Sequence, residues 1–207
     1  MSAIPTVLRG LYAITPDGLA TAQLVERVRA AVAGGARVIQ YRNKAADPSL
    51  ARAQAVALQA MVRPARLIIN DDLDLACAID ADGVHLGATD GDLARARRAL
   101  APGKILGASC YNRLDTAVAA VAAGADYVAF GSVYASGTKP NAVRARLELF
   151  VQAKRELRVP ICAIGGITAA NATAVITAGA DMIAVISAVF DAPDVQAAAA
   201  ALAREFS

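Results

Sequence analysis

Histidine, tryptophan and cysteine are scarce in this chain of 207 residues, which has one histidine, no tryptophan and three cysteines. The single His85 lies inside an expected strand, where a packed or hydrogen-bonded ring is the ordinary state, so little room is left for chemistry that requires a catalytic imidazole. Cys77, Cys110 and Cys162 stand in apolar stretches and are odd in number. We therefore expect reduced core thiols in a cytoplasmic protein, and neither a disulfide framework nor a zinc site.

Long apolar runs and runs of like charge are also missing. No apolar stretch approaches the ~20 residues of a membrane span, and the first ten residues lack a signal-peptide pattern. The net charge is +3, with no long basic segment. These absences argue against nucleic acid and membrane partners. The length suits one domain, spanning residues 1–207, with a sizeable core.

What the chain does have is a regular alternation of short apolar runs and alanine-rich amphipathic stretches. The expected strands are Leu11–Thr15, Arg37–Tyr41, Arg66–Asn70, Gly83–Leu86, Ile105–Ser109, Tyr127–Gly131, Ile161–Gly165 and Met182–Ser187. The expected helices cover residues 20–33, 48–62, 72–79, 91–100, 113–123, 144–157, 169–178 and 194–205. Eight such units predict an α/β fold, a single (β/α)8 TIM barrel. The alternative, a doubly wound sheet, usually has fewer strands, and no Gly-x-Gly-x-x-Gly follows the first strand.

A repeated segment supports this count of units. Four segments each close a helix and enter an even-numbered strand, mostly with glycine as the helix stop. They are Ala33–Ile39, Ile79–His85, Ala123–Ala129 and Ala178–Ala184, and they recur roughly every 45 to 55 residues. We interpret the repeat as structural and not as functional.

Acidic residues follow two neighbouring strands of the expected barrel. Asp71 comes directly after the third strand, and Asp90 follows the fourth. Adjacent parallel strands lie ~4.8 Å apart, so the two carboxylates can converge, and a cation between them would remove their repulsion. Mg²⁺ takes one or two carboxylates together with waters and phosphate oxygens, and it suits such a pair. The alternative is that each acid caps the helix that follows it.

Basic residues gather at the carboxyl ends of the strands, where the active sites of such barrels lie. The chain has four lysines against 17 arginines, and Lys44 and Lys139 both fall on this rim, with Arg42 beside the first. An ammonium meets a phosphate as a point charge. The rim therefore suits a polyanion such as a diphosphate, although a solvated loop lysine is the alternative at each position.

A second anion site is expected after the seventh and eighth strands, where barrels of this kind often bind phosphate. Gly165 and Gly166 let backbone amides approach a phosphate, and Ser187 adds a hydroxyl, although glycines are also ordinary turn residues. The long polar connection 132–141 is interpreted as a lid, with Gly137 allowing movement. Two phosphorylated ligands over one Mg²⁺, without an obvious protein nucleophile, indicate a reaction that joins substrates after loss of diphosphate.

Six motifs occur in order between about Leu11 and Val189. They are Gln40-x-Arg42-x-Lys44, Ile69-Asn70-Asp71, Gly83-Val84-His85-Leu86-Gly87-x-x-Asp90, Gly107-x-Ser109, Phe130-Gly131 leading to Ser136-x-Thr138-Lys139, and Ala163-Ile164-Gly165-Gly166-Ile167 followed by Asn171. Together they resemble the thiamine-phosphate synthase family. The resemblance implies a (β/α)8 transferase that couples 4-amino-2-methyl-5-hydroxymethylpyrimidine diphosphate with a thiazole phosphate, giving thiamine phosphate and diphosphate. Where the thiazole is carboxylated, CO₂ is lost as well.

The resemblance also implies roles for individual residues. The substrate-binding residues would be Gln40, Tyr41, Arg42, Asn43, Lys44, Asn70, Ser109, Ser136, Gly137, Thr138, Lys139, Gly166, Ile186 and Ser187. Those acting on the departing diphosphate as catalytic residues would be Arg42, Lys44, Ser109 and Lys139. Asp71 and Asp90 would carry Mg²⁺. The family mechanism is dissociative: the pyrimidine amino group expels diphosphate, and the thiazole nitrogen captures the methylene cation without needing a general base.

Four positions depart from the usual pattern of the family. Asn43 stands where Glu is common, Ala88 where Gln is frequent, Tyr111 where His is frequent and Ser136 where Thr is usual. None of them removes a metal or diphosphate ligand.

Three rival functions are weighed against this one. A thiazole tautomerase on the same barrel needs no diphosphate site, and the retained basic and acidic rim residues argue against it. A sugar-phosphate epimerase would want acid–base groups inside the barrel, where only His85 is available. A non-enzymatic barrel would bind thiazole phosphate without Mg²⁺-dependent turnover. We expect small phosphorylated partners, and the sequence leaves a homo-oligomer open.

Overall fold

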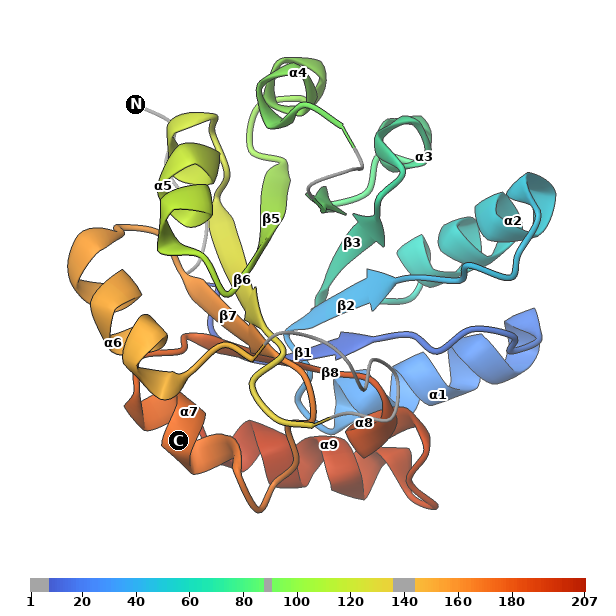
Figure 1. The fold of residues 1–207 in the computed structure, drawn as a ribbon. Helices are drawn as coiled ribbons and strands as arrows, with labels where there is room; N and C mark the ends of the chain where they lie inside the picture. Colours follow the sequence, from blue (N-terminus) through green and yellow to red (C-terminus); the bar gives the residue numbers. More distant parts are fainter. Residues whose placement is uncertain (1–7, 88–90, 136–143) are drawn as a thin grey trace.

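The computed structural model describes residues 8–87, 91–135 and 144–207. Eight strands close there into a parallel barrel in sequence order, with β8 paired to β1 and the helices outside (Figure 1). The strands are β1 (Gly10–Ile14), β2 (Val38–Tyr41), β3 (Arg66–Asn70), β4 (Gly83–Leu86), β5 (Ile105–Tyr111), β6 (Tyr127–Gly131), β7 (Ile161–Ile164) and β8 (Met182–Val185). The helices are α1 (Thr21–Ala33), α2 (Pro48–Gln59), α3 (Leu73–Ala78), α4 (Leu93–Ala99), α5 (Leu114–Ala122), α6 (Leu147–Glu156), α7 (Ala172–Thr177), α8 (Ser187–Phe190) and α9 (Val195–Arg204). The prediction of a (β/α)8 TIM barrel is confirmed.

The strands separate two apolar layers, because successive side chains of a strand point to opposite faces. In β2, Ile39 and Tyr41 face outward into the layer between sheet and helices, whereas Val38 faces the barrel interior. The interior layer consists of Tyr12, Ile14, Val38, Ile68, Tyr127, Ala129, Cys162, Met182 and Ala184. Gln40 follows Val38 on the inward face, so the interior becomes polar towards the carboxyl ends of the strands.

Three expectations about local structure need correction. The eighth strand does not reach Ser187 but ends at Val185, and Ser187 begins the short helix α8. The fifth strand continues beyond Ser109 to Tyr111, with a shift of register against β6 between these two residues. Cys77 is an exposed thiol on α3 and not a core residue, whereas Cys110 and Cys162 are buried free thiols as expected. No described helix is both long and apolar enough to cross a membrane.

The repeated segments place an aspartate at the start of three even-numbered strands. The carboxylates of Asp82, Asp126 and Asp181 accept the backbone N–H of Leu67, Leu106 and Ile161, at 2.8, 2.8 and 2.9 Å. Each carboxylate also pairs with one or two basic side chains, namely Arg63 and Arg66, Arg97, and Lys154. Arg37 occupies the corresponding position in the first segment. The repeat therefore joins neighbouring strands at the amino-terminal end of the barrel, which supports its structural interpretation.

Asp82→Ala is expected to lower the free energy of unfolding by about 2–4 kcal/mol, because it leaves the Leu67 amide and two guanidinium groups without their shared acceptor. The Asp82 residue is 8% exposed, so water replaces the lost contacts poorly. The measurement is the urea denaturation midpoint. Asp115→Ala is the control, because that carboxylate pairs with Arg113 on the open surface and should shift the midpoint little. Equal midpoints for Asp82→Ala and the unaltered protein would contradict the prediction.

Candidate active site

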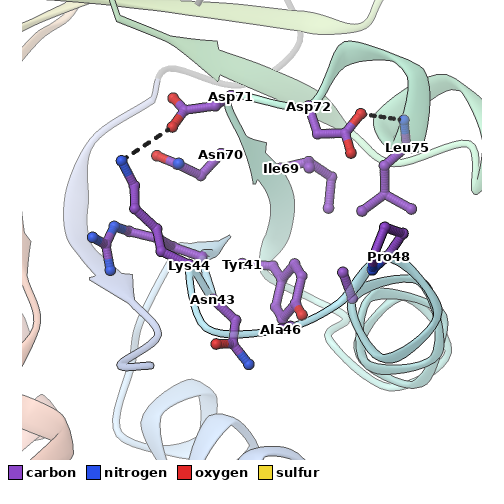
Figure 2. Close-up of a pocket in the computed structure, with 12 residues that line it drawn as sticks. Tyr41, Asn43, Lys44, Ala46, Pro48, Ile69, Asn70, Asp71, Asp72 and Leu75 are labelled. Carbon is purple, nitrogen blue, oxygen red and sulfur yellow. Dashed lines mark hydrogen bonds and ion pairs between the residues drawn. The ribbon is translucent and has the colours of Figure 1, made fainter. Parts of the chain in front are cut away.

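A cavity of about 420 Å³ opens at the carboxyl ends of β2 and β3, between the starts of α2 and α3 (Figure 2). Six of the residues expected to bind substrate or metal line it: Tyr41, Arg42, Asn43, Lys44, Asn70 and Asp71. The remaining lining residues are Ala46, Pro48, Ala51, Ile69, Asp72 and Leu75. The structure thus brings the basic motif after β2 and the Asn-Asp motif after β3 to one site.

Asp17, in the connection between β1 and α1, holds the basic motif in place. Its two carboxylate oxygens each lie 2.9 Å from Nη1 of Arg42, and Oδ1 accepts the backbone N–H of Lys44 at 2.7 Å. The Thr15 hydroxyl accepts the backbone N–H of Arg42 and donates to its carbonyl oxygen, at 2.9 and 2.8 Å. Five hydrogen bonds therefore fix the first part of the β2–α2 loop to the end of β1 and the residues after it.

The carboxylate of Asp71 faces the basic motif across the cavity. Its Oδ2 lies 3.7 Å from Nζ of Lys44, an ion pair marked by a dashed line in Figure 2. The Asp71 backbone has φ 63°, a left-handed conformation that aspartate and asparagine adopt more readily than other residues with side chains. A hydrogen bond from its backbone N–H to the carbonyl oxygen of His85, at 2.9 Å, joins it to the end of β4.

The helices after β3 and β4 are capped by aspartates other than Asp71 and Asp90. Asp72, and not Asp71, is the N-cap of α3, where its carboxylate accepts the N–H of Leu75 at 2.8 Å. Asp92 is the N-cap of α4 and accepts the N–H of Ala94 at 2.8 Å. The capping alternative is thereby removed for Asp71. Asp90 lies outside the described residues, but Asp92 is the N-cap of α4, the helix that follows it.

The donors at this site suit a small hard cation. The Asp71 side chain is 30% exposed, so its carboxylate oxygens are accessible to a ligand. Within residues 8–87, 91–135 and 144–207, no group of three or more metal-ligating side chains comes together. An ion bound here by one or two carboxylates would complete its shell with water and phosphate oxygens, which is the habit of Mg²⁺.

Tyr41 and Asn43 contact α2 as well as the cavity. The Tyr41 hydroxyl donates to Oε1 of Gln54 at 2.8 Å, and burial raises the pKa of this phenol to about 12. Nδ2 of Asn43 donates to the same Gln54 oxygen at 3.0 Å, while its Oδ1 accepts from Gly18 and Ala45. Both side chains therefore tie the end of β2 and the loop after it to α2.

Gln40 and Ser109 lie inside the barrel and not in the cavity wall. Gln40 is 3% exposed, and its amide nitrogen donates to the hydroxyl of Tyr12 at 2.7 Å. The Ser109 hydroxyl lies 2.9 Å from Nε2 of His85. His85 itself is 8% exposed with both ring nitrogens in hydrogen bonds, which confirms the expected core histidine.

The ends of β7 and β8 supply the second group of expected residues. Gly165 and Gly166 have φ 105° and 62°. A Cβ on Gly165 would lie 2.2 Å from Oγ of Ser132, and one on Gly166 would lie 2.4 Å from the carbonyl oxygen of Ala135. The glycines are thus required by the close approach of the β6–α6 connection, whatever else they bind. Ser187 is exposed at the start of α8 and follows Ile186.

Several expected residues lie outside the described parts of the chain. They are Asp90, Ala88, Ser136, Gly137, Thr138 and Lys139. The interpretation of residues 132–141 as a lid therefore stays a prediction for 136–141. The described start of this connection, from Ser132 to Ala135, runs along the end of β7, where Val133 and Tyr134 donate to the carbonyl oxygens of Ile164 and Gly165.

Comparison with known proteins identifies the family. Residues 11–189 match the family model described as thiamine monophosphate synthase. The chain belongs to the thiamine monophosphate synthase family. A relative from Aromatoleum aromaticum, named thiamine-phosphate synthase, is 59% identical over 198 residues and covers 95% of each chain. Another of that name, from Chromobacterium violaceum, is 53% identical over 205 residues, which is 98% of this chain and 99% of the relative.

Solved structures agree with this membership. The thiamine phosphate pyrophosphorylase from Pyrococcus furiosus superimposes with a TM-score of 0.84 at 38% identity and covers 95% of each chain. A 3-hexulose-6-phosphate synthase, at 20% identity and a TM-score of 0.72, is similar in fold alone. As a member of the thiamine monophosphate synthase family, the chain is a transferase of thiamine biosynthesis.

Sequence reasoning missed the residues that position the site of this family member. Asp17 and Thr15 follow the first strand, whose carboxyl end was not considered beside the ends of strands two to eight. Their polarity at that end was the available signal. Gln54 had no such signal, because a glutamine on an amphipathic helix is ordinarily a surface residue, and here it is fully buried.

Proposed function

We propose that this chain joins 4-amino-2-methyl-5-hydroxymethylpyrimidine diphosphate to a thiazole phosphate, forming thiamine phosphate and releasing diphosphate, with Mg²⁺ bound at Asp71 and Asp90. The observation that carries the proposal is that Arg42, Lys44, Asn70 and Asp71 line the same cavity. Two cations beside the Asp71 carboxylate suit a diphosphate that binds together with a metal ion. The names of the two relatives described above support the synthase reaction and not the tautomerase.

The basic side chains would stabilise the negative charge that develops on the departing diphosphate. Preorganised donors are effective because they need not reorient during the reaction. Asp17 supplies that preorganisation for Arg42, because it contacts one guanidinium nitrogen and leaves the other N–H groups to donate to a ligand. Lys44, with a side chain 63% exposed against 21% for Arg42, is the more exposed cation and pairs with Asp71. Lys139 would add a further cation and Ser109 a hydroxyl.

Bound Mg²⁺ would neutralise diphosphate oxygens, with Asp71 and Asp90 as its protein ligands. Asn70 and Gln40, on neighbouring strands, would orient the pyrimidine over the barrel interior. Arg42 and Lys44 would hold the diphosphate at the rim while its bond to the pyrimidine methylene breaks. The thiazole nitrogen carries its own lone pair, so its attack on the methylene needs no general base from the protein.

The thiazole phosphate would bind at the ends of β7 and β8, through the Gly166 amide, Ile186 and the Ser187 hydroxyl, with Ser136, Gly137 and Thr138 closing over it. Asn171 supports this loop: its side chain accepts the N–H of Thr168 and donates to the carbonyl oxygen of Gly166, at 2.9 and 3.0 Å. The two phosphorylated substrates would then meet over the polar interior of the barrel.

Ser187→Ala is expected to raise the KM for thiazole phosphate about tenfold, the effect of removing one hydrogen bond to a charged group. Since Ser187 is exposed at the start of α8, its loss should not affect stability. Steady-state kinetics with each substrate varied in turn provide the measurement. A change confined to the KM for the pyrimidine diphosphate would show that the two substrate sites are assigned in reverse.

The experiment that tests the function is the formation of thiamine phosphate by the purified protein, detected as thiochrome after oxidation, with both substrates and with or without Mg²⁺. Product that depends on Mg²⁺ is the expected result. Absence of product in the presence of Mg²⁺ would overturn the proposal, and a tautomerase assay on the same preparation would then test the rival function.

A further inference from the structure

A chain of hydrogen bonds crosses the barrel interior and joins two of the proposed substrate-binding residues. Gln40 Nε2 lies 2.7 Å from the Tyr12 hydroxyl, which lies 2.8 Å from the Tyr127 hydroxyl. The Tyr127 hydroxyl lies 2.8 Å from Nδ1 of His85, and Nε2 of His85 lies 2.9 Å from the Ser109 hydroxyl. Five strands, β2, β1, β6, β4 and β5, each contribute one member.

The members of this chain are enclosed. Tyr12 and Tyr127 are each 1% exposed, and their rings meet edge to face with centroids 6.0 Å apart. Gly107 makes room for the second ring, because a Cβ at that position would lie 2.2 Å from Cζ of Tyr127. Burial raises the pKa of both phenols well above the ordinary value. Each phenol is therefore neutral and has one hydrogen to donate.

Counting hydrogens gives the chain a direction. The Gln40 amide nitrogen can only donate, so the Tyr12 oxygen accepts from it and the Tyr12 hydrogen goes to the Tyr127 oxygen. The Tyr127 hydrogen then goes to Nδ1 of His85, which must be the unprotonated ring nitrogen. The proton of the neutral imidazole is consequently on Nε2, from which it is donated to the Ser109 oxygen.

For the Gln40 amide as it stands, with Nε2 and not Oε1 beside the Tyr12 hydroxyl, the opposite direction leaves a buried group unsatisfied. If Nδ1 of His85 carried the proton, the Tyr127 oxygen would accept it and the Tyr127 hydrogen would turn to Tyr12. The Tyr12 oxygen would then accept from both Gln40 and Tyr127, and its own hydrogen would have no acceptor in the chain. A buried donor left without an acceptor is unfavourable. A doubly protonated His85 ring would also leave the Tyr12 hydrogen without an acceptor in the chain, because its Nδ1 would donate to Tyr127.

We propose that Tyr12, Tyr127 and His85 are positioning residues for the reaction, which make the Ser109 hydroxyl a donor directed at the diphosphate and the Gln40 amide oxygen an acceptor directed at the pyrimidine. The identity of these ligands rests on the proposed function. Since its oxygen accepts from His85, Ser109 keeps its hydrogen for an anion, and since its nitrogen donates to Tyr12, Gln40 presents oxygen. The two ends of one chain thus acquire opposite hydrogen-bonding roles.

The position of the histidine proton tests the direction of the chain on the ligand-free protein. The chain has one histidine, so ¹⁵N-histidine labelling gives a single imidazole in long-range ¹H–¹⁵N spectra. The expected result is a protonated Nε2 and an unprotonated Nδ1. A protonated Nδ1 or a doubly protonated ring would overturn the proposal, whether or not the protein is active.

Tyr127→Phe tests the consequence for the reaction. It is expected to lower kcat about tenfold or more, with the KM for thiazole phosphate unchanged, because Ser109 is no longer held as a donor to the diphosphate. The same variant should give a mixture of His85 tautomers. Phe150→Leu is the matched control: it alters a buried aromatic ring on α6 that packs against Phe130 and should reduce stability without changing kcat or the tautomer.

The outcomes separate this inference from the proposed function. Unchanged kcat and an unchanged imidazole spectrum in Tyr127→Phe would overturn the positioning role while thiamine phosphate is still made. Failure of the unaltered protein to make thiamine phosphate would overturn the proposed function, and with it the assignment of diphosphate as the ligand of Ser109.

Discussion

Asp71→Asn is expected to lower kcat for thiamine phosphate formation about a thousandfold while leaving the fold intact, because it removes one of two proposed protein ligands of Mg²⁺. Asparagine is the informative replacement. It keeps the size of the side chain and tolerates the left-handed backbone at φ 63°, so the variant changes charge and little else. Raising the Mg²⁺ concentration should restore part of the rate, which a purely structural defect would not show.

The control for this prediction lies one residue away. Asp72→Asn removes the same charge, but asparagine is as good an N-cap as aspartate, and the Asp72 carboxylate is directed at the start of α3. Its kcat and its response to Mg²⁺ should stay close to those of the unaltered protein. If both variants lost activity alike, the effect would come from the general charge of the rim, and the metal assignment to Asp71 would be wrong.

The barrel could be predicted from sequence because its signals are local. Short apolar runs such as Arg66–Asn70 and Gly83–Leu86 are bounded by glycine, asparagine or aspartate, and the structure places both strands within these limits. The predicted end of the eighth strand, at Ser187, was wrong for a related reason. Ile186-Ser187-Ala188 continues the apolar pattern of β8, and a single helical turn such as α8 is too short to show its own periodicity.

The site could be predicted only in part, because its supporting contacts are long-range. The basic motif after β2 and Asp71 after β3 were found since they stand at strand ends, and the structure places them in one cavity. The partners of Gln40 were not found. Tyr12 and Tyr127 are 115 residues apart, and in the sequence each is one more aromatic residue of a buried strand. Only the closure of the barrel brings their hydroxyl groups together.

Asp17 illustrates the same limit at the rim. Each of its contacts joins it to a residue 25 or 27 positions away, so no local pattern marks it. The capping alternative considered for Asp71 and Asp90 lay one and two positions away from the N-caps of the structure, Asp72 and Asp92, for the opposite reason. Asp71 and Asp72 are adjacent, and the sequence offers two equal candidates for one helix start, which only the backbone conformation distinguishes.

Arg42→Ala is expected to lower kcat/KM for the pyrimidine diphosphate about a hundredfold or more, because it removes a cation from the position where charge accumulates on the leaving group. Steady-state kinetics with the pyrimidine diphosphate varied provide the measurement.

Asp17 has two opposite effects on the binding of diphosphate by Arg42. As a competing anion it would weaken the hold of Arg42 on diphosphate, and as an anchor it would strengthen it. We expect the anchoring effect to outweigh the competition. Only one guanidinium nitrogen of Arg42 contacts Asp17, so the other N–H groups can bind diphosphate. The ion pair between Arg42 and Asp17 is exposed, so it is weak and competes little with the substrate.

Asp17→Asn is therefore expected to lower kcat/KM about tenfold, and to have almost no further effect in the Arg42→Ala background, because residues that act through one contact are not additive. Asparagine can still accept the N–H of Lys44 through its oxygen, so the loop stays in place and the cycle reports on Arg42 alone. Steady-state kinetics of the four proteins provide the measurement. A rise in kcat/KM for Asp17→Asn would show that the carboxylate competes with the substrate, and full additivity would show that it acts independently of Arg42.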